Sequence, residues 1–192
     1  AYLTVGGQNS NNTVRISDAF IDALINSKPW VLSGVVDKSV SKTIDPKELW
    51  NLIGEATKLC GDPGVQFHDT INAWNTVKNF GKIKSCNPCA EYLHVDDSAC
   101  NLGSLCDGKF LEGESGNYTF NIEKYKHAVS LAVITLDISV AMSSYPTRKI
   151  AENSHKLRTI GLGRTDLGGM LMRLGLPFDS DLGRGVAAAI SA

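Results

Sequence analysis

Apolar residues in the first third of the chain recur at intervals that predict short strands alternating with helices. Residues 13–16 have the β-branched character of a strand, and Ser17 stands where a helix N-cap belongs. The segment 29–44 predicts a hairpin or a pair of strands, with a turn at 33–34 and a second strand that includes 35–36. The apolar positions of the first helix are Phe20, Ile21, Leu24 and Ile25.

The clearest local signal for a helix is Asp45 followed by Pro46, a capping side chain before a first-turn proline. We expect this helix to run to about Cys60 and to end at Gly61, because glycine readily takes up the left-handed conformation that closes a helix. A turn and then a strand over 65–67 are predicted to follow.

After residue 121 the pattern changes to a helical period, which predicts a long, mostly buried helix that ends before Pro146. A second helix is expected to start near Thr147, and Asp179 to cap the last one. The segment 161–175 contains several glycines, but their spacing is wrong for a dinucleotide-binding loop, so close packing of a helix over them is the better account. The apolar positions of the long helix are Ile122, Tyr125, Val129, Ala132, Val133, Leu136, Val140 and Met142.

Composition and charge narrow the class of protein. The chain has 192 residues, of which 43% are hydrophobic and 20% charged, and its formal net charge of −1 gives no electrostatic case for binding nucleic acid or an anionic membrane. The most apolar stretch, 131–136, is interrupted by Asp137 and is too short to span a bilayer. We therefore expect an α/β or α+β fold in a single segment that covers residues 1–192, with more helix in the second half.

The cysteines lie mostly in a loop-rich region, and their number argues against a disulfide scaffold. There are five, no signal peptide precedes them, and reduced thiols with metal or redox roles in a cytoplasmic protein are the better account. A zinc-binding module would combine Cys86 and Cys89, which have the spacing of a zinc knuckle, with Cys100 and Cys106, which are too far apart for one. The scattered histidines predict no metal site. A buried thiol is the simplest expectation for Cys60, Cys86 and Cys106.

The alternation of Asn87, Cys89 and Glu91 is the most informative pattern in this loop-rich region, residues 68–115. In an extended backbone, residues two apart point to the same side, so these three would share one face. That face would carry a hydrogen-bonding amide, a nucleophilic or one-electron sulfur and a general base. The combination indicates a catalytic site more strongly than any of the three residues does alone.

The residues 87–92, Asn-Pro-Cys-Ala-Glu-Tyr, are followed by 96–105, Asp-Asp-Ser-Ala-Cys-Asn-Leu-Gly-Ser-Leu. In these two blocks the chain resembles the catalytic subunit of ribonucleotide reductase, and most of all its adenosylcobalamin-dependent class. The resemblance runs in consistent order over nearly the whole chain. Three further stretches carry it: residues 8–15, 61–67 and 157–163.

The resemblance implies a fold and a set of roles. The fold is a ten-stranded α/β barrel in which a central finger loop presents a radical cysteine, here Cys89. A thiyl radical on Cys89 would take the 3′-hydrogen of a ribonucleotide, Glu91 would be the general base on the 3′-hydroxyl, and Asn87 would hydrogen-bond the substrate. Cys100 matches one member of the dithiol that reduces the 2′-carbon. The substrate-binding residues are expected to be Asn87, Pro88, Cys89, Ala90 and Glu91.

The same resemblance implies partners outside this sequence. Adenosylcobalamin would generate the radical, with a metal-containing partner subunit as the alternative source. A thioredoxin-like thiol would restore the dithiol, and the remaining barrel segments would come from the same or another chain. No cysteine precedes Cys60, so the second reducing thiol is expected elsewhere, and we expect no turnover from these 192 residues alone.

Overall fold

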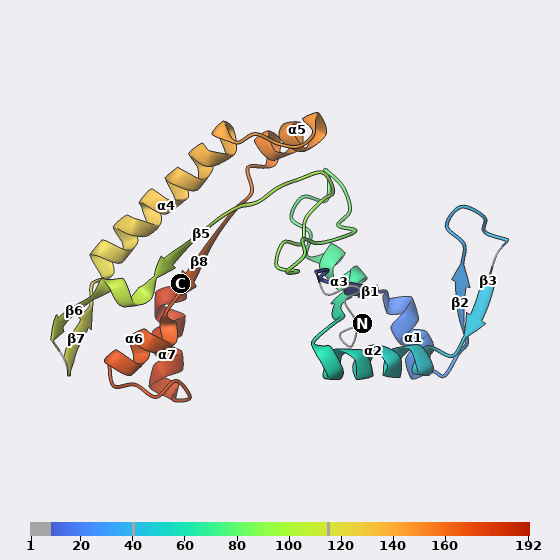
Figure 1. The fold of residues 1–192 in the computed structure, drawn as a ribbon, viewed down its shortest axis with the longest axis horizontal. Coiled ribbons are helices and arrows are strands. Elements are labelled where there is room, and N and C mark those ends of the chain that lie inside the picture. Colours follow the sequence, from blue (N-terminus) through green and yellow to red (C-terminus); the bar gives the residue numbers. More distant parts are fainter. Residues whose placement is uncertain (1–8, 40, 115) are drawn as a thin grey trace. The chain divides into compact units, whose positions relative to one another are not determined.

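The computed structural model describes residues 9–39, 41–114 and 116–192, which form two compact units (Figure 1). Gln8, the first residue of the stretch 8–15, lies outside the described residues. The first unit ends at Asp96 and the second begins at Asp97. Each unit is built around one pair of parallel strands, so the expectation of a mixed α/β fold is confirmed.

The first unit is organised by strands β1 (Thr13–Ile16) and β4 (Gly64–Phe67), which pair in parallel from Thr13 opposite Gly64 to Ile16 opposite Phe67. Helices α1 (Asp18–Ile25) and α2 (Pro46–Cys60) lie between them in sequence and contact each other, and α3 (His68–Ala73) follows β4 directly. The apolar core of this unit comprises Ile16, Phe20, Ala23, Ile53, Ile83 and Val95.

The two helix starts predicted in the first unit are confirmed by their caps. Ser17 Oγ accepts a hydrogen bond from the backbone N–H of Phe20 (3.3 Å), and Asp45 Oδ1 accepts one from Lys47 (2.8 Å). Gly61 ends α2 in the left-handed conformation with φ 78°. These are local interactions, which is why the sequence alone could locate them.

The expected hairpin is present, but its second strand was placed wrongly. Strands β2 (Trp30–Ser33) and β3 (Ser41–Ile44) pair antiparallel, and Val35 and Val36 lie in the connection, 94% and 99% exposed. The reason lies in Asp37, whose Oδ1 accepts hydrogen bonds from both the backbone N–H and the hydroxyl of Ser39 (2.9 and 2.6 Å). This local turn outweighs the β-propensity of the two valines.

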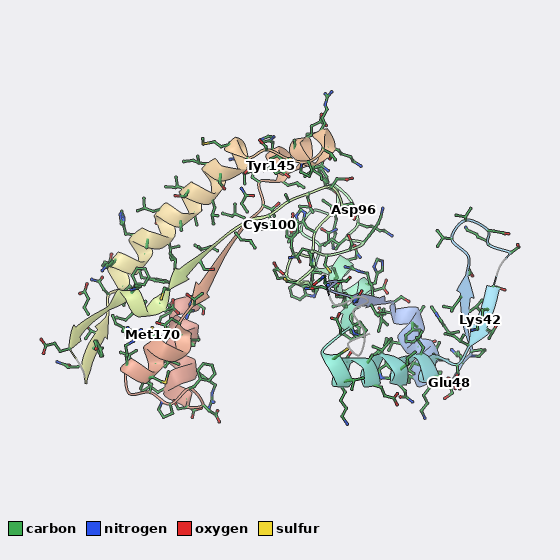
Figure 2. All side chains as sticks on the ribbon, in the orientation of Figure 1. Lys42, Glu48, Asp96, Cys100, Tyr145 and Met170 are labelled. Carbon is green, nitrogen blue, oxygen red and sulfur yellow. The ribbon has the colours of Figure 1, made fainter. Side chains whose placement is uncertain are left out.

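The second unit is organised by strands β5 (Asn101–Cys106) and β8 (Ile160–Thr165), which are parallel and in register from Asn101 opposite Ile160. The connection contains the 3₁₀ turn η1 (Asp107–Phe110), the hairpin of β6 (Leu111–Glu114) and β7 (Asn117–Phe120), and helices α4 (Ile122–Met142) and α5 (Arg148–Leu157). Helices α6 (Leu167–Arg173) and α7 (Asp181–Ser191) follow β8. Met170 of α6, labelled in Figure 2, and its neighbour Leu171 are fully buried.

The loop-rich expectation for 68–115 is confirmed only in part, because α3, β5, η1 and β6 fall within it. Between α3 and β5 the structure has turns and irregular backbone without a helix or strand. The described residues form four separate strand pairs, so the ten-stranded barrel stays a prediction.

Helix α4 has the predicted position, but it is not mostly buried. It lies along β5 and β8 (Figure 1) and buries Leu136 and Val140, whereas the predicted positions Ile122 and Met142 are 58% and 80% exposed. The apolar pattern indicates which side chains would gain from burial. It does not indicate whether another helix or strand packs against each of them. By length and composition alone α4 is also long and apolar enough to cross a membrane, but core helices of globular proteins pass the same test. The shorter stretch 131–136 did not by itself indicate such a helix.

Two expectations near the C-terminal helices were also wrong. Gly161 and Gly163 lie in strand β8, and their closest packing is against the paired strand β5 and not against a helix, since a Cβ on Gly161 would come 2.5 Å from Cδ2 of Leu102. The cap of α7 is Ser180, whose Oγ accepts a hydrogen bond from the backbone N–H of Gly183 (3.0 Å). Asp179 does not cap the helix, and its carboxylate instead pairs with Arg184.

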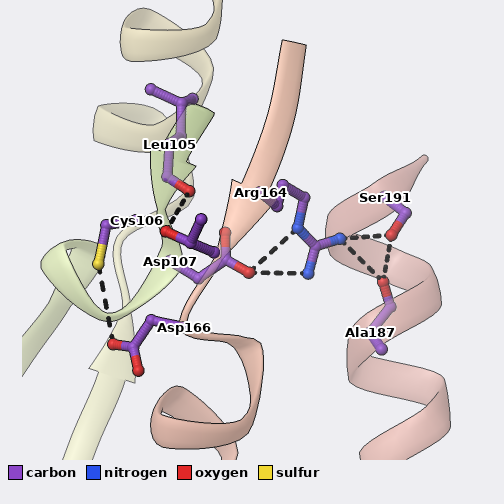
Figure 3. A network of polar contacts seen from close by, with 8 residues as sticks. Leu105, Cys106, Asp107, Arg164, Asp166, Ala187 and Ser191 are labelled. Carbon is purple, nitrogen blue, oxygen red and sulfur yellow. Dashed lines mark hydrogen bonds and ion pairs between the residues drawn. The ribbon is translucent and has the colours of Figure 1, made fainter. Parts of the chain in front are cut away.

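A buried ion pair joins β8 to the turn that follows β5 (Figure 3). Asp107 is fully buried, and its Oδ2 accepts from Nε and Nη2 of Arg164 at 3.0 and 2.8 Å. The same guanidinium donates to the carbonyl of Ala187 (3.3 Å) and to the hydroxyl of Ser191 on α7. No sequence pattern pointed to this pair, because its two residues are 57 positions apart.

Candidate functional site

The segment that carries Cys89 is anchored at its start by a clamp on Ile83. The carboxamide of Asn72 on α3 both accepts from the backbone N–H of Ile83 and donates to its carbonyl, each at 3.0 Å. Arg15 of β1 adds a third contact to the backbone of Ile83 by donating to the same carbonyl (3.4 Å), and the side chain of Ile83 is buried. The path of the chain into the candidate site is therefore fixed by β1 and α3.

Cys89 lies in a hydrogen-bonded turn over residues 87–90, called the Cys89 turn below. The backbone N–H of Ala90 donates to the carbonyl of Asn87 (3.0 Å), and Pro88 occupies the second position, where its fixed φ favours a turn. Ala90 has a φ of 67°, in the left-handed region. Oδ1 of Asn87 also accepts from the backbone N–H of Tyr92 (2.9 Å), so Asn87 closes the turn with both its main chain and its side chain.

The geometry behind the alternation argument is therefore wrong. The backbone turns at Pro88 and Cys89 instead of running extended, because the Asn87–Ala90 hydrogen bond and the proline impose a turn. Asn87, Cys89 and Glu91 are still brought into one short loop. Asn87 is half-buried, whereas Cys89 and Glu91 are exposed.

One neighbour of Cys89 was not found from the sequence. Nδ2 of Asn11 lies 4.0 Å from Sγ of Cys89, although the two residues are 78 positions apart. Asn11 belongs to the stretch 8–15 that carries part of the resemblance, but no spacing rule connects it with the cysteine.

The segment after the Cys89 turn packs back onto its unit. The rings of Tyr92 and His94 are stacked, with centroids 5.2 Å apart and an angle of 8° between their planes. Burial lowers the pKa of His94, so its neutral form is favoured. Lys84 and Asp96 form an exposed ion pair (3.6 Å) that ties the two ends of the segment together.

Cys100 belongs to the second unit, immediately before β5, and is half-buried. Its sulfur lies beside β8, since a Cβ on Gly161 would be 3.6 Å from Sγ. The small residue at position 161 thus leaves room for the thiol next to the parallel strand pair.

The remaining three cysteines, Cys60, Cys86 and Cys106, were expected to be buried and are half-buried instead. Cys60 Sγ donates to the carbonyls of Ala56 and Asp62 (3.1 and 3.3 Å), Cys106 Sγ lies 3.8 Å from Oδ2 of Asp166, and Cys86 is half-buried. Within the described part of the chain, no group of three or more His, Cys, Asp or Glu side chains is placed to hold a metal ion, so the geometry lends no support to a zinc module.

Comparison with known proteins gives one consistent result. The family model described as ribonucleotide reductase, barrel domain, matches residues 5–192. The vitamin B12-dependent ribonucleotide reductase of Agrobacterium fabrum (strain C58) is 44% identical over 192 residues, which cover 100% of this chain and 15% of that protein. The Streptomyces coelicolor protein of the same name is 41% identical over 96% of this chain and 19% of its own length.

A more distant relative agrees. The vitamin B12-dependent ribonucleoside-diphosphate reductase of Thermoplasma acidophilum is 32% identical over 90% of this chain and 22% of its own length. The chain thus spans less than a quarter of the length of these relatives, and the match includes both the Cys89 turn and Cys100. A family match over nearly every residue shows that this chain belongs to the ribonucleotide reductase family, as part of its barrel domain.

Proposed function

We propose that this chain is the finger-loop segment of a vitamin B12-dependent ribonucleotide reductase, which converts ribonucleotides to 2′-deoxyribonucleotides. The observation that carries the proposal is the Cys89 turn, which exposes a thiol two residues before an exposed carboxylate in a chain that matches relatives of that name along its length. The two parallel strand pairs would be part of the ten-stranded barrel, with the Cys89 turn as the tip of the finger loop.

Cys89 is the proposed site of the radical. An S–H bond is close in strength to a ribose C–H bond, so a sulfur radical can take the 3′-hydrogen reversibly. The sulfur gains one proton and one electron together and becomes a thiol, and the 3′-carbon is left with the unpaired electron. Exposure of Cys89 at the turn suits this step, because the sulfur must approach a carbon atom of the substrate closely.

Glu91 and Asn87 have proposed roles next to the sulfur. Glu91, exposed two residues further on, would take the proton of the 3′-hydroxyl, which assists the departure of the 2′-hydroxyl as water. Because Oδ1 of Asn87 already accepts from Tyr92, this side chain would offer the substrate the hydrogens of its Nδ2. Pro88 and Ala90 would shape the substrate-binding turn between them.

Cys100 is the proposed first thiol of the reducing dithiol. Its partner would come from a part of the complete protein beyond this sequence, and a thioredoxin-like reductant would restore the pair. Such chemistry requires reduced thiols, which the cytoplasm maintains. The remaining barrel segments complete the site, so we expect the 192 residues alone to be inactive.

The proposed cofactor is adenosylcobalamin, as the names of the relatives suggest. The exposed sulfur of Cys89 fits this assignment, because a bulky group can reach it, and Pro88 and Cys89 are the exposed residues of the turn that would face the group. When bound, adenosylcobalamin supplies the one-electron chemistry that removes a hydrogen atom from a thiol. The protein then positions the thiol and shields it.

The test uses the complete protein with adenosylcobalamin, a ribonucleotide and dithiothreitol. Cys89→Ser should abolish deoxyribonucleotide formation and leave nucleotide binding, measured by equilibrium dialysis, nearly intact. Cys86→Ser, three residues away in the same segment, is the matched control and should retain turnover. Turnover by the Cys89→Ser protein would overturn the proposal.

A further inference from the structure

The side chains of Asn11 and Cys89 are in contact although the two residues are 78 positions apart in the sequence. Nδ2 of Asn11 lies 4.0 Å from Sγ of Cys89, which is within reach of an N–H···S hydrogen bond, and both side chains are exposed at this point of the first unit. The contact joins the entrance of β1 to the tip of the Cys89 turn.

The backbone on the Asn11 side is held in place by its neighbours. Oδ2 of Asp62 accepts from both the backbone N–H and Nδ2 of Asn12, at 3.3 and 3.1 Å. The carbonyl of Asn12 accepts from Gly64 (2.9 Å), and β1 begins at the next residue. Asn11 is therefore attached to the strand pair that forms the base of the unit.

The Cys89 side is held independently. The Asn87–Ala90 hydrogen bond and the contact of Asn87 with the backbone of Tyr92 close the turn, and the clamp on Ile83 fixes its approach. Two separately anchored pieces of backbone thus bring one amide donor to one sulfur.

We infer that Asn11 is a positioning residue that holds the sulfur of Cys89 during hydrogen-atom transfer, an inference that rests on the proposed function. In this contact the amide donates and the sulfur accepts. An accepting sulfur needs no hydrogen of its own, so the contact persists whether the sulfur is a radical or a thiol. The S–H hydrogen of the thiol is not used in this contact, so it can point toward the substrate carbon to which the hydrogen atom is returned.

The chemistry of the side chain supports the assignment. A carboxamide donor is uncharged and has no readily oxidised group, so it can lie beside a sulfur radical without supplying a competing electron or proton. An aspartate of the same shape has no donor hydrogen, so it would repel the lone pairs of a radical sulfur, and it would accept the S–H hydrogen of the thiol and direct it away from the substrate. The inference therefore predicts that the donor hydrogens, and not the shape of the side chain, are what matters.

The experiment compares Asn11→Ala, Asn11→Asp and the matched control Asn9→Ala in the complete protein with adenosylcobalamin and a ribonucleotide. Loss of one hydrogen bond should lower kcat roughly fivefold to tenfold in Asn11→Ala, with little change in KM. In Asn11→Asp, kcat should fall further. With a 3′-deuterated substrate the isotope effect on kcat should rise in both variants, because hydrogen transfer limits the rate more strongly. Asn9→Ala should match the unchanged protein.

A second measurement needs neither cofactor nor substrate. The rate at which iodoacetamide alkylates Cys89, followed by mass spectrometry of the peptide that contains it, should change severalfold in both Asn11 variants, because the amide no longer holds the sulfur in one position. Unchanged kcat, isotope effect and alkylation in Asn11→Ala would overturn the inference. So would an Asn11→Asp protein that behaves normally, since shape alone would then suffice.

Failure of the proposed function would look different. If Cys89→Ser retains turnover, Cys89 is not the radical site, and the positioning role falls with it whatever the alkylation rates show. If Cys89→Ser is inactive while all Asn11 variants are normal, the proposed function stands and only the role of Asn11 is refuted.

Discussion

Replacing Asp107 by alanine should loosen the second unit at the junction of β8, α7 and the turn after β5. Asp107 is completely buried, and its Oδ2 accepts both guanidinium hydrogen bonds from Arg164, whose side chain is only 20% exposed. The substitution removes one charge and leaves the other inside the protein without its partner, and this unpaired charge is the main cause of the expected loss.

The size of the effect follows from the remaining contacts. Breaking a buried ion pair by removing one partner costs about 3 to 5 kcal/mol. Arg164 keeps the carbonyl of Ala187 and the hydroxyl of Ser191, and it has some access to water, so the lower end of the range applies. A loss of about 3 kcal/mol corresponds to roughly a hundredfold larger opening equilibrium.

Hydrogen exchange of the complete protein, resolved by peptide, measures this opening directly. Amides of β5 and β8 that open with the unit should exchange roughly a hundredfold faster in Asp107→Ala. Arg184→Ala is the control, because it removes only the exposed pairs with Asp179 and Asp181 and should leave exchange in β5 and β8 unchanged.

A double variant tests whether the cause is the unpaired charge. Oδ1 of Asp107 is buried without a hydrogen-bond partner, so the native pair is itself incompletely solvated. Replacing both residues, by Asp107→Leu with Arg164→Met, should therefore cost less than the sum of the two single changes. Additive losses, or an Asp107→Ala protein whose β5 and β8 amides exchange normally, would refute the reasoning.

Two other expectations concern stability. Gly113→Ala should destabilise the β6–β7 hairpin by more than about 1 kcal/mol in urea titrations, because the φ of 110° is strained for alanine and the new Cβ would collide with the backbone carbonyl of Asn117. Gly161→Ala should cost less, because the side chain of Leu102, 63% exposed, can move away; equal losses would contradict this. Burial lowers the pKa of His94, so the unfolded chain binds its proton first and the free energy of unfolding should fall as pH drops below about 6.5. His94→Gln should flatten that part of the pH profile, and an unchanged slope would exclude His94 as its cause.

The start and the end of α2 were predictable because their causes lie within a few residues. Asp45 accepts from Lys47 two positions away, and Gly61 closes the helix by its own conformational freedom. The hairpin shows the limit of such reasoning. Val35 and Val36 have the composition of a strand, yet the Asp37–Ser39 turn, an equally local feature, decides the register.

Features that depend on distant residues could not be read from the pattern. The period of α4 indicates a helix with many apolar positions, but exposure of Ile122 and Met142 depends on what packs beside them. The Asp107–Arg164 pair and the Asn11–Cys89 contact each join residues more than fifty positions apart. The sequence motif identified the residues of the Cys89 turn. Their arrangement depends on the path of the backbone, which the motif does not give.

The turn changes the argument for Cys89 in a specific way. An extended strand would place three side chains on one face, but its backbone amides would need a neighbouring strand to hold them. In the turn, Asn87 satisfies the backbone of Ala90 and Tyr92 with its own carbonyl and carboxamide oxygens. The loop therefore needs no strand partner at its tip and can expose a sulfur that is still held in place. Replacing Asn87 would then disturb the position of Cys89 before any substrate binds, so a loss of activity there reports on two functions of one side chain.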